Sequence, residues 1–325
     1  MAMIQRNLIL LTVLTGLSLL ATPLRGQQDG QYTQFMFNRL YYTPGFAGSE
    51  GGPCLSLLYR KQWIGLEGSP EAQLISFNTP LFQQRVGLGV NLYRTSIGIT
   101  RNVTAEMAYS YRIPLGQGYL GIGLSGSVRY YAEDYSDERL KGTQDINLDQ
   151  SIPTGLQTRY LPNFGAGVYY QGKDWYVGGG VPRLVEGNID FSNGSDRPST
   201  ELRHYYALGG YRIHLNNFLA LHPQFLLKYV GDAPFDADLN LSVEMKDQFH
   251  AGLSYRFGGD RDPGLGESID VILGFRIRQQ FLLSVGYDIA LSEIRDYQNG
   301  TFEVLLRFCF GKDAASAIDN PRFFQ

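Results

Sequence analysis

The sequence predicts an all-β protein, a transmembrane antiparallel up-and-down β-barrel of about 14 strands, and three observations lead to this prediction. Segments of strand-like sequence recur along nearly the whole chain. The joints between them are by turns short and long, and aromatic residues gather near the predicted strand ends. Bacterial outer-membrane barrels sort their loops in this way, with short periplasmic turns and long extracellular loops. A soluble β-sandwich has no reason to do so.

The predicted joints define the topology. The short ones are residues 80–83, 113–117, 171–173, 214–216, 246–247 and 278–279, and the longest are residues 132–161 and 183–200. An even number of strands leaves both termini on the side of the short turns. We therefore expect both termini in the periplasm and the long joints at the cell surface.

The strand-like segments alternate between an apolar and a polar face. In residues 85–94, Val86, Leu88 and Val90 alternate with glycine and asparagine, and residues 102–112 and 302–310 follow the same rule. Runs of about 9–13 residues with one apolar face cross the hydrocarbon core at a tilt, with lipid outside and a polar lumen inside. The expected aromatic girdle consists of Trp63, Tyr109, Tyr111, Trp175 and Tyr229.

The composition and the first residues fit an exported barrel. Charged residues make up 18% of the 325 residues, below the roughly 25% of soluble domains. Residues 8–20 are apolar and follow Arg6, which predicts a signal peptide over residues 1–26, with an N-terminal anchor as the alternative. The expected division continues with a periplasmic lead-in or plug segment over 27–52, a barrel over 53–311 and a periplasmic C-terminal tail over 312–325.

No pattern of residues predicts an enzyme or a cofactor. The four histidines, His204, His214, His222 and His250, lack the spacing of metal ligands, and neither a G-x-S-x-G elbow nor a phosphate-binding loop is present. No basic run favours nucleic acid.

Charged residues on the predicted lumen face allow two interpretations of the lumen, an open pore or a plugged one. The candidates are Arg60, Arg85, Glu106, Arg129, Arg256 and Arg307. Because the acids on this face are fewer, a net-basic lumen would favour anions in an open pore. Alternatively, the arginines pair with the acids or with an inserted segment, and the lumen is plugged.

The two cysteines fall near the periplasmic ends of the first and last predicted strands. Closing the barrel makes these strands neighbours, which brings Cys54 near Cys309. They either form a disulfide at the seam, which requires Cα atoms within about 7 Å, or remain two free buried thiols.

The start of the mature chain resembles a known family. Residues 31–40 (QYTQFMFNRL) and 43–49 (TPGFAGS) resemble the opening blocks of PorP/SprF proteins, outer-membrane proteins of the Bacteroidetes type IX secretion and gliding machinery. Residues 59–65 (YRKQWIG) and 320–324 (NPRFF) resemble later blocks. Thr43 and the Gly45-Phe46 pair depart from the family's usual Asn and Ala-Tyr.

The resemblance implies a non-enzymatic role in protein secretion or gliding motility. The implied partners are periplasmic secretion-system proteins such as a PorE-like lipoprotein, a secreted adhesin or other cargo, and outer-membrane lipid. Candidate partner contacts, which alternatively pack into or beneath the barrel, are Phe35, Met36, Phe37, Asn38, Phe46, Asn320, Pro321, Arg322, Phe323 and Phe324. A porin-like channel for small solutes and a surface anchor for an adhesin are the alternative functions.

Overall fold

The computed structural model describes residues 30–140, 153–191, 200–231, 235–258, 266–278 and 280–310. The strands are β1 (Cys54–Lys61), β2 (Glu71–Leu81), β3 (Val86–Ile97), β4 (Thr100–Leu115), β5 (Gly118–Asp134), β6 (Leu156–Gln171), β7 (Trp175–Val181), β8 (His204–Tyr211), β9 (Ile213–Asn216), β10 (Leu219–Val230), β11 (Asp236–Met245), β12 (Phe249–Phe257), β13 (Ser268–Ile277), β14 (Phe281–Ala290) and β15 (Thr301–Cys309). The same ranges also contain four short 3-10 helices: η1 (Phe35–Phe37), η2 (Arg39–Tyr41), η3 (Pro44–Phe46) and η5 (Glu293–Tyr297).

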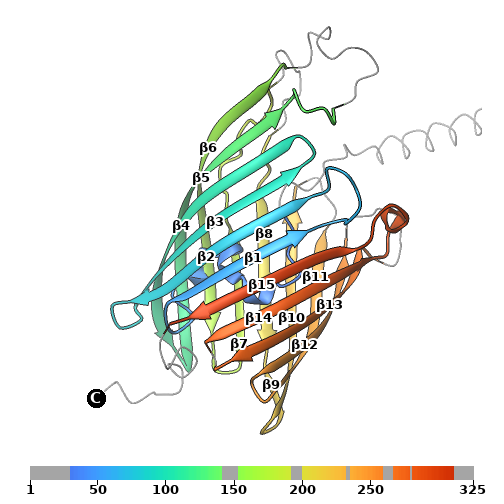
Figure 1. The fold of residues 1–325 in the computed structure, drawn as a ribbon. Coiled ribbons are helices and arrows are strands. Elements are labelled where there is room, and N and C mark those ends of the chain that lie inside the picture. The colour runs from blue at the N-terminus through green and yellow to red at the C-terminus, as the bar shows by residue number, and fades with distance from the viewer. Residues whose placement is uncertain are drawn as a thin grey trace, which may run out of the picture.

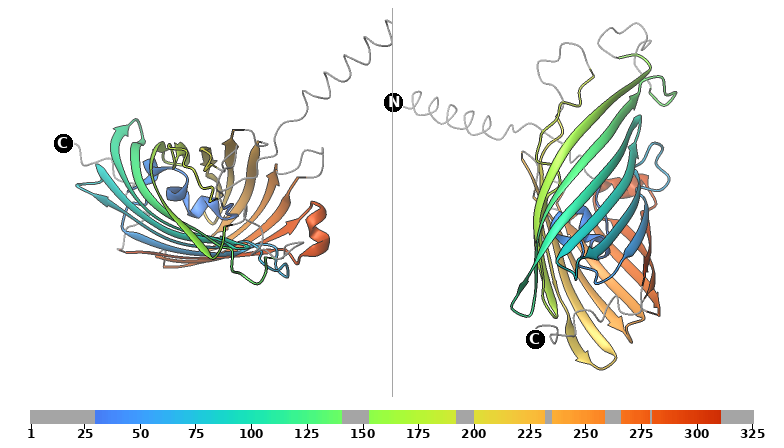
Figure 2. Two further views of the ribbon diagram at one scale, coloured as in Figure 1. Left: turned by 90° about the horizontal axis from the view of Figure 1, so that it is seen from above. Right: turned by 90° about the vertical axis from the view of Figure 1, so that its left-hand side faces the viewer.

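These strands form one closed antiparallel barrel (Figures 1 and 2). Apart from β8 and β9, strands that are consecutive in sequence pair with each other, and β1 pairs with β15, which closes the sheet into a barrel. β8 and β9 both lie along β10 and are separated only at Arg212, so together they form one wall strand. The predicted barrel of about 14 strands is therefore confirmed.

The alternation of side chains places apolar residues on the outside of the wall. On β4, Val103, Met107 and Tyr109 are exposed, whereas Thr104, Glu106 and Ser110, which point to the opposite face, are buried. Apolar side chains facing outward and polar side chains facing a lumen are the arrangement that a bilayer requires of a barrel. None of the helices in the described ranges has the length and the apolar character needed to span a bilayer.

The predicted joints are mostly correct, with two differences. Residues 214–216, predicted as a turn, pair with β10 as β9, and the turn follows at Asn217 and Phe218. On the side of the long loops, β3 and β4 continue to a tight connection at Gly98 and Ile99, where Gly98 has a φ of 53°. Hydrogen bonding between neighbouring strands extends them beyond the apolar residues, which the alternation alone does not reveal.

Residues 30–52 precede β1, and most of them lie inside the barrel (Figure 2). Residues 31–49, which we call the plug, carry η1 to η3 and are buried at nearly every position. The expected signal peptide (1–26) and C-terminal tail (312–325) fall outside the described residues.

Candidate functional site: a plugged lumen and a charged vestibule

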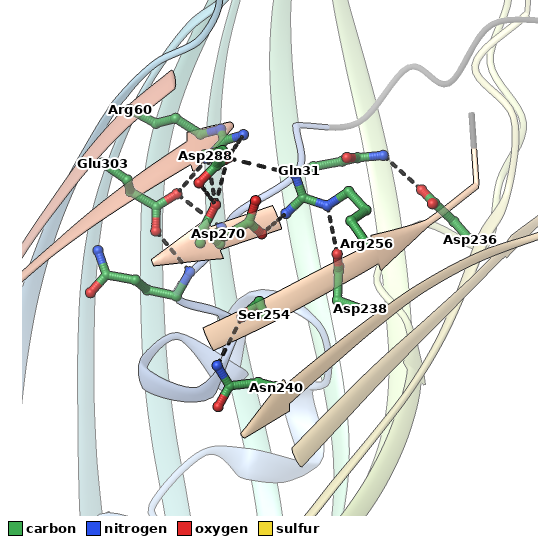
Figure 3. Close-up of polar contacts among 12 residues, drawn as sticks. Gln31, Arg60, Asp236, Asp238, Asn240, Ser254, Arg256, Asp270, Asp288 and Glu303 are labelled. Carbon is green, nitrogen blue, oxygen red and sulfur yellow. Dashed lines mark hydrogen bonds and ion pairs between the residues drawn. The ribbon is translucent and has the colours of Figure 1, made fainter. Parts of the chain in front are cut away.

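The start of the plug is held by a buried ionic cluster on one wall of the barrel (Figure 3). Glu303 accepts hydrogen bonds from the backbone N–H groups of Thr33 (3.0 Å) and Gln34 (2.8 Å). The Thr33 hydroxyl donates to Asp288 at 2.7 Å. Arg60 bridges the two carboxylates, at 2.7 Å from Asp288 and 3.1 Å from Glu303. Donors from the plug therefore help to satisfy carboxylates that would otherwise be buried without partners.

The cluster continues around the wall through Arg256. Its guanidinium lies 2.5 Å from Asp238 and 3.7 Å from Asp270, and Lys228 lies 2.8 Å from Asp238. Gln31 of the plug donates to Asp236 at 2.6 Å. Across β1 and β10 to β15 the cluster holds three basic side chains, Arg60, Lys228 and Arg256, and five acidic ones, Asp236, Asp238, Asp270, Asp288 and Glu303.

The end of the plug crosses the lumen and lies directly on the backbone of β3 to β7. Gly45 fits so closely that a Cβ built on it would lie 2.8 Å from the Tyr169 nitrogen. A Cβ on Gly180 would lie 2.5 Å from the Tyr42 carbonyl oxygen. Ser110 donates to the Gly45 carbonyl at 3.2 Å, and Thr43 donates to the Gly179 carbonyl at 3.0 Å. Glycine is required where two backbones approach this closely.

Aromatic rings fill the space between these two anchors. The Tyr41 ring makes edge-to-face contacts with Tyr32, Tyr42 and Tyr93, with centroids 5.0–5.3 Å apart. Burial raises the pKa values of the Tyr32, Tyr41 and Tyr42 hydroxyls. Such pairs contribute beyond their buried area, so the plug forms an aromatic core with the wall.

A second segment closes over the plug from the long-loop side. Glu201, in the connection between β7 and β8, lies 2.5 Å from Arg129 and 3.0 Å from Arg183, and all three are buried. Arg183 also donates to the Tyr93 hydroxyl at 3.1 Å. The described parts of this connection therefore fold into the lumen above the plug.

The short-turn end holds a cavity of about 460 Å³, which we call the vestibule. Its floor includes Arg39 and Phe46 of the plug. The Arg39 guanidinium lies 3.8 Å from the centroid of the Tyr176 ring and donates to the Tyr169 hydroxyl at 2.9 Å. Ionisable groups from the turns and from the strands next to them line much of the remainder: Lys173, Asp174, Arg212, His214, His222, Arg276 and Arg307.

Several of these vestibule charges are already paired. Glu244 lies 2.8 Å from Arg276 and 3.0 Å from His222, and His214 lies 3.2 Å from Asp174. Arg307 contacts Glu50. The vestibule therefore presents a mixed, strongly polar surface at the short-turn end of the barrel.

The structure places the predicted lumen residues in different environments. Arg60, Glu106, Arg129 and Arg256 are buried inside the barrel. Arg85 is a correction, because it lies in the turn between β2 and β3 and is exposed.

The expectation of a net-basic lumen is wrong, because more acidic side chains face the lumen than the strand pattern predicts. Asp236, Asp238 and Asp270 share the inner face with Glu244 and Asp288. The signal was available in residues 236–245, where Asp, Asp, Asn, Ser and Glu alternate with apolar residues.

The candidate partner contacts at the N-terminus also need correction. Phe35, Met36, Asn38 and Phe46 are at most 4% exposed, and Phe37 packs against His250 with ring centroids 5.2 Å apart. Phe35, Met36, Phe37 and Asn38 therefore belong to the interior of the barrel and do not form a docking surface, and Phe46 contributes only to the floor of the vestibule. Residues 320–324 lie outside the described residues.

The two cysteines meet at the seam between β1 and β15. Cys54 and Cys309 are directly opposite in the strand register, with Cα atoms 4.0 Å apart, and their sulfur atoms are bonded. Glu50 lies beside them and completes the one group of metal-ligand type found within the described ranges. Since the sulfurs are bonded to each other, neither is available as the thiolate that a metal would need.

Comparison with known proteins identifies the family. Residues 24–308 match the family described as type IX secretion system membrane protein PorP/SprF. No curated protein matches the chain. Among solved structures, the chain is similar to the outer-membrane protein Omp33 of Acinetobacter baumannii, with 8% identity over 80% of this chain and 98% of that one and a TM-score of 0.47. It is also similar to the monoaromatic hydrocarbon channel CymD, with 11% identity over 88% and 95% of the two chains and a TM-score of 0.47. With a fold and a family that agree, the chain belongs to the PorP/SprF family of type IX secretion system membrane proteins and is a β-barrel of the outer membrane.

Proposed function

We propose that this protein is a non-enzymatic docking component of the type IX secretion machinery, which supports export or surface attachment of cargo and contacts periplasmic partners. The observation that carries the proposal is the plug, which runs from the wall of β11, β14 and β15 to the wall of β3 to β7. A barrel whose lumen is crossed by its own chain is better suited to holding partners than to passing solutes.

The vestibule and the turns around it are the surface that a periplasmic partner would meet. This assignment follows from the short turns, which face the periplasm in outer-membrane barrels. The vestibule presents charged groups of both signs, and charge complementarity favours a specific register between partners. β15 ends at Cys309 at this same end, and we include Asn320, Pro321, Arg322, Phe323 and Phe324 of the sequence that follows it among the proposed partner contacts. A PorE-like lipoprotein is the proposed partner here, and a secreted adhesin is the proposed cargo.

Affinity purification from native membranes tests the proposal. The Lys173→Glu variant reverses an exposed charge at the vestibule, and a second variant lacks residues 320–325. The control is Arg295→Glu, in the connection between β14 and β15 at the opposite rim, where the side chain is 63% exposed. We expect periplasmic secretion proteins to be recovered with the wild type and the control and to be lost from at least one vestibule-side variant. Equal recovery with all four proteins would contradict a docking role for this end.

Conductance separates the docking component from a porin-like channel. In planar bilayers the wild-type barrel should show no large steady conductance, because the plug fills the lumen. A variant lacking residues 31–48 should conduct, provided that it shows the heat-modifiable electrophoretic mobility of a folded barrel. A large, stable conductance of the wild type would favour the porin alternative and overturn our proposal.

A further inference from the structure

Charged residues on the outer wall mark the edge of the apolar band on the long-loop side. Three successive rows of register partners cross β1 to β4. The lowest row is apolar and consists of Leu57, Ile75, Leu92 and Ala105. The middle row contains one charged residue and consists of Tyr59, Gln73, Arg94 and Val103. The uppermost row is largely charged and consists of Lys61, Glu71, Ser96 and Arg101. Since alternate residues along a strand are about 7 Å apart, the surface changes from lipid-like to cationic over roughly 14 Å.

A small cavity lies at this boundary, and we call it the rim pocket. It has a volume of about 200 Å³, and its ionisable lining residues are Lys61, Arg94, Arg101, Arg139 and Glu71. The lining residues alone, four basic groups and one acid, carry a formal charge of +3, and Asp137, which pairs with Arg139 at 2.6 Å, lowers the local excess to +2. A water molecule takes about 30 Å³ in the liquid, so the cavity has room for a tetrahedral oxyanion and several waters.

Two of the four basic groups are held by neighbours, and two are not. Lys61 lies 3.9 Å from Glu71, and Arg139 lies 2.6 Å from Asp137 and donates to the Gly98 carbonyl at 3.0 Å. Arg94 and Arg101 are exposed and make no hydrogen bond or ion pair with any other described residue. They are diagonal neighbours on β3 and β4, because Arg94 is opposite Val103 and Arg101 is opposite Ser96.

The spacing of Arg94 and Arg101 suits a phosphate group. Diagonal neighbours of an antiparallel pair are about 7–8 Å apart at their Cα atoms, so two guanidinium groups can approach a single oxyanion from both sides. Arginine binds phosphate through two parallel N–H···O bonds, and these bonds are stronger than those between neutral groups.

The position of the rim pocket on the outer wall indicates which phosphate-bearing molecule it meets. The side chains of Arg94 and Arg101 lie on the lipid-facing side of the wall, directly above the apolar rows, at the depth of lipid headgroups. With the long loops at the cell surface, this is the outer leaflet. We propose that the rim pocket binds a phosphate group of lipid A, the phosphorylated glycolipid of that leaflet, and so fixes the barrel to a specific lipid at the wall of β1 to β4.

The test uses the full barrel refolded in detergent without lipopolysaccharide. Diphosphoryl lipid A is titrated, and the bound fraction is read by native mass spectrometry. The Arg94→Gln/Arg101→Gln variant removes the two free arginines. The matched control, Arg85→Gln/Lys246→Gln, removes two exposed charges from the turns at the opposite rim. Both variants should keep the electrophoretic mobility of the folded barrel, because all four side chains are exposed.

We expect the rim-pocket variant to bind diphosphoryl lipid A about tenfold to a hundredfold more weakly than the wild type, and the control to bind about as well as the wild type. Dephosphorylated lipid A should bind the wild type as weakly as the intact lipid binds the rim-pocket variant. Equal binding of lipid A by the wild type and the rim-pocket variant would overturn the site. Binding of phosphatidylglycerol as tight as that of lipid A would overturn the assignment to the outer-leaflet glycolipid.

Discussion

Replacing Gly123 by alanine should loosen the plug without disturbing the barrel wall. Gly123 is on β5 and faces the lumen, where the backbone of Pro44 and Gly45 lies well inside van der Waals contact of any added Cβ. Backbone atoms cannot rotate away as the end of a side chain can. Overpacking of this kind costs about 1–3 kcal/mol, which corresponds to a roughly 5- to 150-fold change in the equilibrium between seated and unseated plug.

Hydrogen exchange measures this equilibrium directly. The amides of Phe46 and Ala47 donate within η3, to Thr43 and Pro44, so they exchange when the plug opens. Their exchange rates in Gly123→Ala should rise by about the same 5- to 150-fold, while amides of β11 to β14 keep the wild-type rate. The control is Gly126→Ala on the same strand, because a Cβ there has nothing within 4 Å. If plug amides exchanged equally fast in the two variants, the close approach would not hold the plug and our reasoning would be refuted.

Three further perturbations test the ionic cluster, the seam disulfide and the buried tyrosines of the plug. Arg60→Met should lower the free energy of unfolding by about 3–5 kcal/mol, because Asp288 and Glu303 lose a buried partner. The control Lys61→Met, at a half-exposed ion pair, should lower it by less than about 1 kcal/mol, and equal effects of the two substitutions in urea titrations would contradict this. Reduction of the Cys54–Cys309 disulfide should lower the urea midpoint of unfolding of the wild type by an amount equivalent to about 2–5 kcal/mol, and the midpoint of Cys54→Ser/Cys309→Ser should not change with reductant. If the reductant had no effect on the wild type, the seam disulfide would not form. Because burial raises the pKa values of the plug tyrosines, their stabilising effect is complete below the unfolded pKa of about 10 and falls as the pH rises above it. An absorbance titration should find Tyr32, Tyr41 and Tyr42 un-ionised at pH values where free tyrosine ionises, and ionisation of every tyrosine at the free pKa would contradict their burial.

The sequence predicts the wall of the barrel well because the wall is built from a local signal. A residue on β4 such as Met107 faces lipid and its neighbour Glu106 faces the lumen, and this alternation is visible in any ten-residue window. The turn predicted at residues 214–216 is wrong for the opposite reason, since the strand continues there as β9. Whether Ile213 continues the strand depends on its pairing with Leu221 across the sheet, and a local pattern carries no information on that pairing.

The interior of the barrel is harder to predict because its order comes from contacts distant in sequence. Glu303 and Thr33 are 270 residues apart, and the plug itself shows no period of 2 or 3.6. Phe35 and Met36 resemble an exposed apolar patch when the local sequence is considered alone. Only the closed barrel shows that they are enclosed, because burial at these positions depends on the walls around them.

The glycines nevertheless carry a signal that sequence reasoning can use. Gly87, Gly121 and Gly123 fall on the lumen-facing positions of their strands, and strand curvature alone explains them only in part. A wide lumen lined by residues without side chains would leave a void, and voids are rare because their lining atoms lose contacts. Something else in the chain must therefore fill the space. The aromatic segment before β1 has the composition to do so, and its residues Pro44, Gly45 and Ala47 lie against these glycines. A row of inward-facing glycines together with such a segment predicts a plugged barrel.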